Sequence, residues 1–482
     1  MNPLPLSATQ QARLIRERRI SSVELIQAHL DQIAKVNPRI HAAIEVLADR
    51  ALAEAQAADA SPPRGPLHGV PFSVKDSIEL AGSVSTAGTL GRKTAAPSTE
   101  DSTLVARLRA AGAIPIARTN LPELLFAFES DNLLFGATNN PYDVSRTSGG
   151  SSGGEAALIA ACGSPMGLGS DAAGSVRLPA AFCGIAGIKP TSGRLPRTGH
   201  FPPAGGWIET LWQIGPMSRS VEDLSAMMPL LAGSDDRDPT CVGMPLGHPA
   251  AVDLSNLRVA MYTANGIAST SADVARVVRA AAARLAGAVA SVQEDRPACL
   301  EWAYELEMKF LGADGGDGVW QYLAEMGSTT VNPLLIGWLE KLRRYRTDAA
   351  GFAGYWAELD RYRAEMFAFL SRYDVILCPV YTQPALPHGA STLDENFRGF
   401  SHTMAYNLTG WPGAVVRCGE SEGGLPIAVQ VVARPWREDV VLAVAGWLEE
   451  AFGGWKAPQG LATYRAGSLA ADPLPERPEI PG

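Results

Sequence analysis

Residues 149–187 are dense in glycine, serine and alanine, and they constrain the fold more than any other part of this 482-residue chain. Short apolar runs at 156–161 and 185–188 interrupt the segment, so it is not a low-complexity linker. Glycine at this density lets backbone approach other backbone, or a reacting group, closely. The segment therefore predicts a tightly packed region inside a folded domain.

Strand-like apolar runs alternate with helical patterns on both sides of this segment. The strand-like runs are 70–76, 114–117, 373–379 and 425–433, and helical spacing covers 101–112 and 439–452. Residues 7–60 read as two helices, with Ser21 and Glu24 in a capping-box pattern. Asp101 is positioned to cap the helix at 101–112. The alternation predicts an α/β core with a largely parallel or mixed sheet.

Charge and cysteine usage exclude several classes of function. The chain has 41 basic and 50 acidic residues, a net charge of −9, which argues against nucleic acid or an anionic membrane as partner. Its six cysteines form no C-x-x-C pair, which argues against zinc or redox chemistry. Neither a signal-peptide pattern nor an apolar run of about 18 residues is present. We expect a cytoplasmic enzyme without a metal or cofactor.

The first candidate site is residues 149–155, with the sequence Gly-Gly-Ser-Ser-Gly-Gly-Glu. It contains G-x-S-x-G, the nucleophile elbow of α/β-hydrolases, around Ser151. That pattern requires a later acidic residue and then a histidine. The later histidines, none in a compelling context, are His200, His248, His388 and His402. Alone, the motif favours a tight glycine turn over an esterase.

Two further segments carry reactive groups. Residues 169–177 place small residues ahead of Ser175, so adjacent backbone N–H groups can face one pocket, as an oxyanion hole requires. Lys75 ends a strand-like run and precedes Asp76. Burial at that position would disfavour the charged lysine and let it act as a base. Taken singly, a plain glycine loop and a surface lysine paired with Asp76 are the simpler interpretations.

Together the three segments resemble the amidase signature family. Lys75 is followed 74 residues later by the start of Gly-Gly-Ser-Ser-Gly-Gly-Glu, and Ser175 lies 24 residues beyond Ser151. The resemblance implies a Ser–cis-Ser–Lys triad: Lys75 as base, Ser151 as bridging serine after a cis bond from Gly150, and Ser175 as nucleophile. It implies one large domain with a central mixed, twisted sheet surrounded by helices.

The resemblance also assigns supporting positions. The implied oxyanion-hole donors are the backbone N–H groups of Ala172, Ala173, Gly174 and Ser175. The implied substrate-binding residues are Leu125, Phe126, Gly149 and Gly150. The implied supporting residues are Ser152, Asp171 and Arg177. Within this domain organisation, residues 1–60 form an N-terminal helical segment, 61–465 the catalytic domain with a variable, substrate-shaping helical region at 240–370, and 466–482 a flexible tail.

Further motifs extend the resemblance over roughly residues 5–455. They include Leu67-His68-Gly69-Val70-Pro71, Phe135-Gly136-Ala137-Thr138-Asn139-Asn140-Pro141-Tyr142, Cys183-Gly184-Ile185-Ala186-Gly187-Ile188-Lys189-Pro190-Thr191 and Asn407-Leu408-Thr409-Gly410-Trp411-Pro412. Two positions depart from many relatives, which have glycine at Ala173 and proline at Ser148. A methyl at Ala173 would crowd the oxyanion pocket, or cost about 1 kcal/mol if that position requires a left-handed backbone.

The implied reaction is acyl transfer to a serine, followed by hydrolysis. Glu155, Leu125 and Phe126 make the chain more similar to the fatty-acid-amide-hydrolase branch and to bacterial nylon-oligomer and urethane hydrolases. We therefore expect hydrolysis of apolar acyl or aryl amides, with carbamates (urethanase activity) and esters as further substrates. A glutaminase component of a tRNA-dependent amidotransferase and a catalytically inactive binding protein are the alternatives. A homodimer is also left open.

Overall fold

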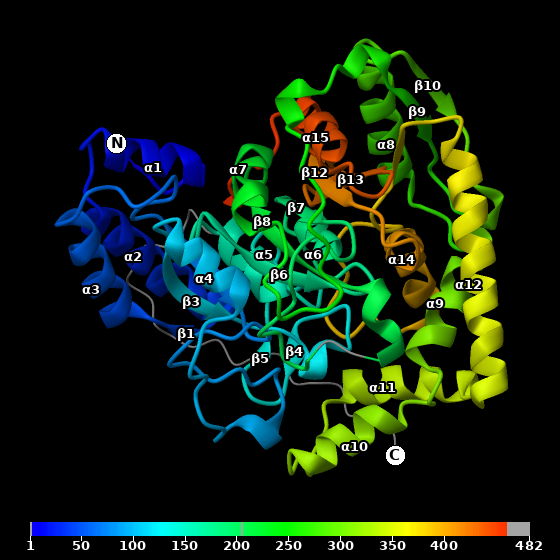
Figure 1. The fold of residues 1–482 in the computed structure, drawn as a ribbon, viewed down its shortest axis with the longest axis horizontal. Coiled ribbons are helices and arrows are strands. Elements are labelled where there is room, and N and C mark those ends of the chain that lie inside the picture. The colour runs from blue at the N-terminus through cyan, green and yellow to red at the C-terminus, as the bar shows by residue number, and fades with distance from the viewer. Residues whose placement is uncertain (1, 204–205, 460–482) are drawn as a thin grey trace.

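An eleven-stranded mixed sheet organises the chain in the computed structural model, which describes residues 2–203 and 206–459 (Figure 1). The expected tail at 466–482 lies outside the described residues. In sheet order, the strands are β1 (Ala43–Val46), β3 (Ile114–Thr119), β2 (Pro71–Lys75), β6 (Met166–Asp171), β8 (Gln213–Ser218), β7 (Ala186–Lys189), β12 (Gly413–Glu420), β13 (Pro426–Ala433), β11 (Val375–Pro379), β9 (Arg258–Met261) and β10 (Ser291–Glu294). β4 (Asp131–Asn132) and β5 (Gly136–Ala137) pair separately.

Parallel pairing is confined to two parts of the sheet. β2 runs parallel to both β3 and β6, and β9 runs parallel to both β10 and β11. The pairs from β6 through β8, β7, β12 and β13 to β11 are all antiparallel. The mixed sheet expected from the sequence is confirmed.

Fifteen α-helices surround the sheet within the described residues. They are α1 (Ala8–Arg16), α2 (Ser22–Ile40), α3 (Ala48–Asp59), α4 (Thr103–Ala110), α5 (Gly153–Ala160), α6 (Arg177–Phe182), α7 (Val221–Leu231), α8 (Ala272–Leu285), α9 (Ala303–Leu311), α10 (Asp317–Glu325), α11 (Pro333–Leu342), α12 (Ala349–Leu370), α13 (Asp394–Phe397), α14 (Ser401–Leu408) and α15 (Glu438–Phe452). No described helix is long and apolar enough to cross a membrane.

Side-chain alternation along the strands divides the core between the two faces of the sheet. Val416 and Ala414 of β12 join the cluster that includes helices α7, α8 and α15. Val415, between them, joins the cluster formed by α2, α5 and α6. The glycine-rich segment supplies both α5 and α6, which explains its composition: the small residues let these two helices pack closely on one face of the sheet.

The N-terminal segment is more complex than the two helices expected for residues 7–60. It contains α1, α2, α3 and strand β1, which pairs with β3 at the edge of the main sheet. The capping box at Ser21 and Glu24 is confirmed, because each side chain accepts a hydrogen bond from the other residue's backbone N–H. The expected cap of α4 is wrong: Ser102 caps that helix, while Asp101 accepts the N–H of Ala81.

The aromatic-rich stretch after residue 296 has two roles in packing. Phe310, Tyr362 and Tyr406 belong to a cluster buried among α9, α12 and α14. Trp338 of α11 instead joins a separate cluster with Phe128, which lies in the loop after β3. The stretch therefore packs on itself and also covers the loop that borders the site.

Candidate active site

Lys75 ends β2 in the interior of the protein, and its side chain is fully buried. Its Nζ lies 2.7 Å from Ser151 Oγ, 3.0 Å from Ser152 Oγ and 3.1 Å from Ser170 Oγ. The surface pairing with Asp76 is therefore excluded. Asp76 instead forms a buried ion pair with Arg118 at 3.0 Å.

Burial lowers the pKa of Lys75 well below its ordinary value, while the charges of Asp171 and Glu155 oppose this effect. Glu155 is also fully buried, and it accepts hydrogen bonds from the hydroxyls of Ser73 and Thr119. Burial raises the pKa of Glu155 to about 7. Both shifts favour the neutral forms, and only the neutral form of Lys75 has a lone pair that can accept a proton.

Ser151 lies directly after a cis peptide bond from Gly150, as the family resemblance implied. The backbone here is packed too closely for any side chain at position 150. A Cβ on Gly150 would lie 2.6 Å from the N atom of Glu129 and 2.7 Å from the O atom of Ala127. Glycine at this position therefore lets the Ser151 segment lie against the loop 124–129, which forms a wall of the pocket described below.

Ser175 sits in the turn between β6 and α6, beside an internal ion pair. Arg177 Nε lies 2.9 Å from Asp171 Oδ2, and both side chains are fully buried. Asp171 also accepts the N–H groups of Gly174, Val176 and Arg177. The Asp171 carboxylate thus holds the Ser175 turn in shape through Arg177 and these backbone donors. The neighbouring charge of Arg177 lowers the pKa of Asp171 below its usual value.

One of the four expected oxyanion donors has a partner within the turn. The N–H of Gly174 donates to Asp171 Oδ1 at 2.8 Å and is therefore already occupied. The N–H groups of Ala172, Ala173 and Ser175 have no acceptor among the described residues. Gly174, not Ala173, has a positive φ, of 125°, so the alanine in place of the usual glycine carries no left-handed strain.

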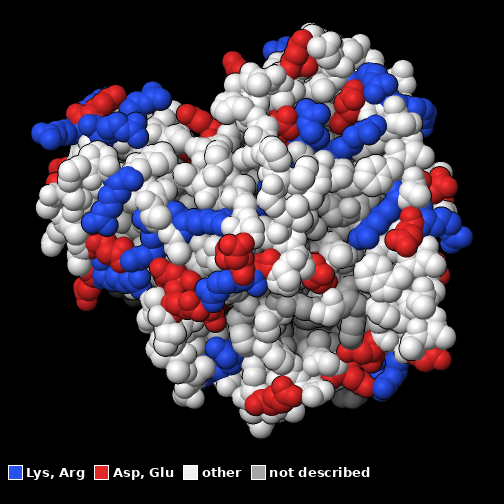
Figure 2. Space-filling model, viewed as in Figure 1, with Lys and Arg blue, Asp and Glu red and all other residues white. Residues whose placement is uncertain are grey.

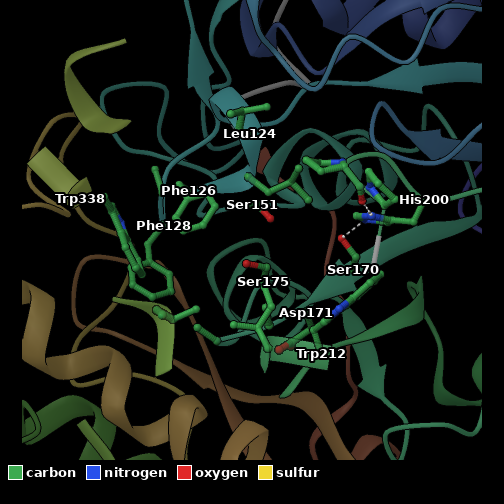
Figure 3. A pocket seen from close by; sticks show the side chains of 18 residues that line it. Leu124, Phe126, Phe128, Ser151, Ser170, Asp171, Ser175, His200, Trp212 and Trp338 are labelled. Carbon is green, nitrogen blue, oxygen red and sulfur yellow. Dashed lines mark hydrogen bonds between the residues drawn. The ribbon is translucent and has the colours of Figure 1, made fainter. Parts of the chain in front are cut away.

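Ser151 and Ser175 open into a pocket with a volume of about 150 Å³ (Figure 3). Phe126, Phe128 and Trp338 lie on one side of the two serines, while His200 and Trp212 lie on the other. The expected substrate-binding residues Leu125 and Phe126 both line it, and so do Ala172 and Ala173. Gly149 and Gly150 do not line the pocket; they lie behind it in the backbone that carries Ser151.

Several pocket residues were missed by sequence reasoning. His200 was set aside for lack of context, yet its Nε2 lies 3.0 Å from Ser170 Oγ, next to Lys75. Trp212 and Trp338 come from distant segments and carry no motif. Leu124 and Leu125 adopt left-handed backbone, with φ of 49° and 67°, which is rare for non-glycine residues and is often retained at functional sites. No sequence signal marks that conformation.

Other kinds of site find no support in the described part of the chain. It holds no group of three His, Cys, Asp or Glu side chains arranged for a metal ion. All six cysteines have free thiols. Basic and acidic side chains are interspersed over the face shown in Figure 2, without a field of one sign.

Comparisons with known proteins find similarity over almost the whole chain. A family model described as Amidase matches residues 24–442. Human fatty-acid amide hydrolase 2 is 33% identical, over 94% of this chain and 90% of its own. Zebrafish (Danio rerio) fatty-acid amide hydrolase 2-A is 34% identical, over 95% of this chain and 91% of its own. The structure of 6-aminohexanoate cyclic dimer hydrolase complexed with substrate superposes with a TM-score of 0.85 at 29% identity, covering 95% of this chain and 99% of that one.

Proposed function

The chain belongs to the amidase signature family of amide C–N hydrolases, and from that premise we propose that it cleaves amides of compact apolar acyl or aryl groups through an acyl-enzyme on Ser175. One observation carries the proposal. A buried Lys75 Nζ lies 2.7 Å from Ser151 Oγ, at the base of an apolar pocket that also exposes Ser175.

The proposed reaction uses the two serines and the lysine as a relay. Neutral Lys75 accepts a proton from Ser151, which accepts one from Ser175 as the Ser175 oxygen attacks the carbonyl carbon. The free N–H groups of the Ser175 turn stabilise the resulting oxyanion. The C–N bond then breaks, and the proton returns through Ser151 to the departing amine. Water hydrolyses the ester by the same relay, releasing the acid and regenerating Ser175.

No hydrogen bond joins Ser151 to Ser175 among the described residues, although both hydroxyls face the pocket (Figure 3). Hydrogen bonds between reacting groups are often long in a free enzyme and tighten only when substrate binds. The relay is therefore proposed for the substrate complex.

Pocket size limits the acyl or aryl group. A dry cavity of about 150 Å³ binds one molecule of the size of benzene. The pocket here has the same volume, and Phe126, Phe128 and Trp338 line one side of it. Trp338 meets Phe126 edge-to-face, with ring centroids 5.9 Å apart. We infer that one aromatic ring, or an acyl chain of similar volume, fills the site without rearrangement of this wall.

Carbamates and esters follow from the same geometry. Their carbonyl carbons can be attacked from the same direction, and the apolar wall of Phe126, Phe128 and Trp338 does not distinguish an amide nitrogen from an ester oxygen. The lower electrophilicity of the carbamate carbonyl should slow its acylation.

A glutamine amide is a poorer fit to this pocket. None of the described residues that line it is a lysine or an arginine, so the α-carboxylate of glutamine would find no cation there. The A subunit of the glutamyl-tRNA(Gln) amidotransferase from Roseiflexus sp. (strain RS-1) is nevertheless 34% identical, over 92% of this chain and 95% of its own. Because of that similarity, glutamine is included among the substrates to be tested.

The experiment is a substrate panel assayed with purified protein. It contains anilides, aliphatic amides of increasing chain length, aryl carbamates, aryl esters and glutamine, each with the Ser175→Ala variant as control. We expect kcat/KM to rise with apolar size up to about one ring, and intact-mass spectrometry to detect an acyl adduct on Ser175. The best rates on glutamine, or rates independent of acyl size, would refute the proposal.

A further inference from the structure

A histidine outside the expected triad is hydrogen-bonded to the lysine through one serine. His200 Nε2 lies 3.0 Å from Ser170 Oγ, which in turn lies 3.1 Å from Lys75 Nζ. The other ring nitrogen, Nδ1, lies 3.0 Å from the carbonyl oxygen of Pro202. His200 and Ser170 are both buried.

Backbone pairing fixes this histidine beside the lysine strand. His200 forms an antiparallel bridge with Ile78, three residues after Lys75. The N–H of Glu79 donates to the carbonyl of Gly199, and the N–H of Phe201 donates to that of Ser77. The position of His200 relative to β2 is therefore set by main-chain bonds and does not depend on its side chain.

The Pro202 carbonyl determines the tautomer of His200. A carbonyl oxygen only accepts, so Nδ1 must carry the proton. Burial lowers the pKa of His200 to about 3, and the charge of Arg197 acts in the same direction, so the ring is neutral. Nε2 is then an acceptor, and Ser170 must donate its hydroxyl proton to it.

This direction of donation constrains the amine of Lys75. Ser170 Oγ, having donated to His200, is left to accept an N–H from Lys75. Ser152 Oγ is likewise left to accept an N–H from Lys75. Its own hydroxyl proton is donated to the carbonyl of Ser170 at 3.3 Å, and the oxygen lies 3.0 Å from Nζ. A neutral amine has two N–H bonds. Both are directed to Ser152 and Ser170, and the lone pair is left for Ser151.

We propose that His200 is a positioning residue, which acts through Ser170 to direct the lone pair of neutral Lys75 toward the hydroxyl of Ser151. The proposal rests on the function proposed above and extends it to a residue outside the triad. Without an acceptor at the place of Nε2, the Ser170 hydroxyl is free to rotate and donate to the Lys75 lone pair, in competition with Ser151.

A purely steric role is the competing explanation, because His200 also lines the pocket and its ring centroid lies 4.6 Å from that of Trp212. Three substitutions separate the two roles. His200→Gln places an amide oxygen near the position of Nε2, where it can accept from Ser170. His200→Asn is polar but reaches only the position of Nδ1. His200→Leu fills similar space without any acceptor.

The measurement is kcat on one anilide that is small enough to make no contact with Trp212. Thermal unfolding of each variant checks that it is folded. We expect His200→Leu and His200→Asn to lower kcat about tenfold or more, as the loss of one directed hydrogen bond predicts. His200→Gln should restore most of kcat. In a Ser170→Ala background, His200→Leu should cause no further loss, because the residue acts through Ser170.

Equal losses for His200→Gln and His200→Asn would overturn the proposal, and so would an undiminished effect of His200→Leu in the Ser170→Ala background. If turnover in that background is too slow to measure, the rate of Ser175 labelling by a fluorophosphonate replaces kcat. A failure of the proposed function looks different: Ser175→Ala would then keep the activity that the His200 variants modulate.

Discussion

The stability of this protein should depend on pH through Glu155, and this dependence should be absent from the Glu155→Gln variant. The side chain is fully buried, and burial raises the pKa of its carboxyl from 4.5 to about 7. A carboxyl with a raised folded-state pKa stabilises the fold fully below its unfolded pKa, and this stabilisation is lost as pH rises through the folded pKa. The relevant window for Glu155 is therefore about pH 4.5 to 7.

The size of the effect follows from the shift. Each pKa unit corresponds to about 1.36 kcal/mol, so the change from 4.5 to about 7 amounts to about 3 kcal/mol. Glu155→Gln keeps the shape of the protonated acid and does not titrate. Its free energy of unfolding should resemble that of the wild type near pH 4.5 and exceed it by up to about 3 kcal/mol at pH 8.

Urea unfolding of both proteins at several pH values between 4.5 and 8 measures this difference. Glu449 offers a matched control, because its pKa is also raised to about 7 and it accepts the N–H of Val221, in a cluster of α7 and α15 that is separate from the one containing α5. Glu449→Gln should show the same sign of pH dependence without altering turnover. A Glu155→Gln variant that is less stable than wild type at pH 8 would refute the reasoning, since the ionised carboxylate would then be stabilised by its surroundings, as by a charged Lys75, and not destabilised by burial.

Three further outcomes test the site. Ser175→Ala should abolish turnover, whereas Ser151→Ala should leave a trace; the reverse order in a kcat comparison would make Ser151 the nucleophile. Activity should be lost as pH falls through the lowered pKa of Lys75, because only the neutral amine is a base, and an optimum near pH 5 in a pH–rate profile would contradict this. In the wild type, each buried methylene of the acyl group should contribute about 0.8 kcal/mol to kcat/KM. Phe126→Ala should flatten this dependence on acyl size without loss of activity on the shortest amides, and an unchanged slope would show that Phe126 does not contact the acyl group.

Local signals predicted the strand that carries Lys75, but not the helices that follow the two serines. The run ending at Lys75 had strand character, whereas α5 and α6 begin inside residues 149–187, where no helical spacing marks their starts. The strand signal is local, because an apolar run of a few adjacent residues is enough to indicate a buried strand. Strand β1 escaped the same reasoning: it is four residues long, and its pairing partner β3 lies about seventy residues away.

The pocket wall could not be predicted in the same way, because packing and not local pattern assembles it. Phe126 and Trp338 meet only when α11 covers the loop after β3, and Trp212 lines the opposite side of the pocket from a third distant segment. An aromatic residue in a helix is usually core, and nothing in the neighbourhood of Trp338 distinguishes it from the buried Phe310. His200 was missed for a related reason: its partner Ser170 lies in β6, and backbone pairing to Ile78 brings the two together.

The adjacent residues Lys75 and Asp76 show how one local feature supports two different interpretations. A lysine followed by an aspartate suggests a mutual surface pair, yet successive side chains at the end of a strand point to opposite faces. Arg118 takes the Asp76 carboxylate in a buried ion pair at 3.0 Å, so Asp76 is not available to stabilise a charge on Lys75. The lysine then faces hydroxyl groups, which solvate an ammonium less well than water does. The effect of burial, which lowers the pKa of Lys75, outweighs the opposing effect of the charges of Asp171 and Glu155. Arg118 thus pairs with a neighbouring carboxylate that would otherwise favour the charged form of Lys75, although it touches none of the three triad residues.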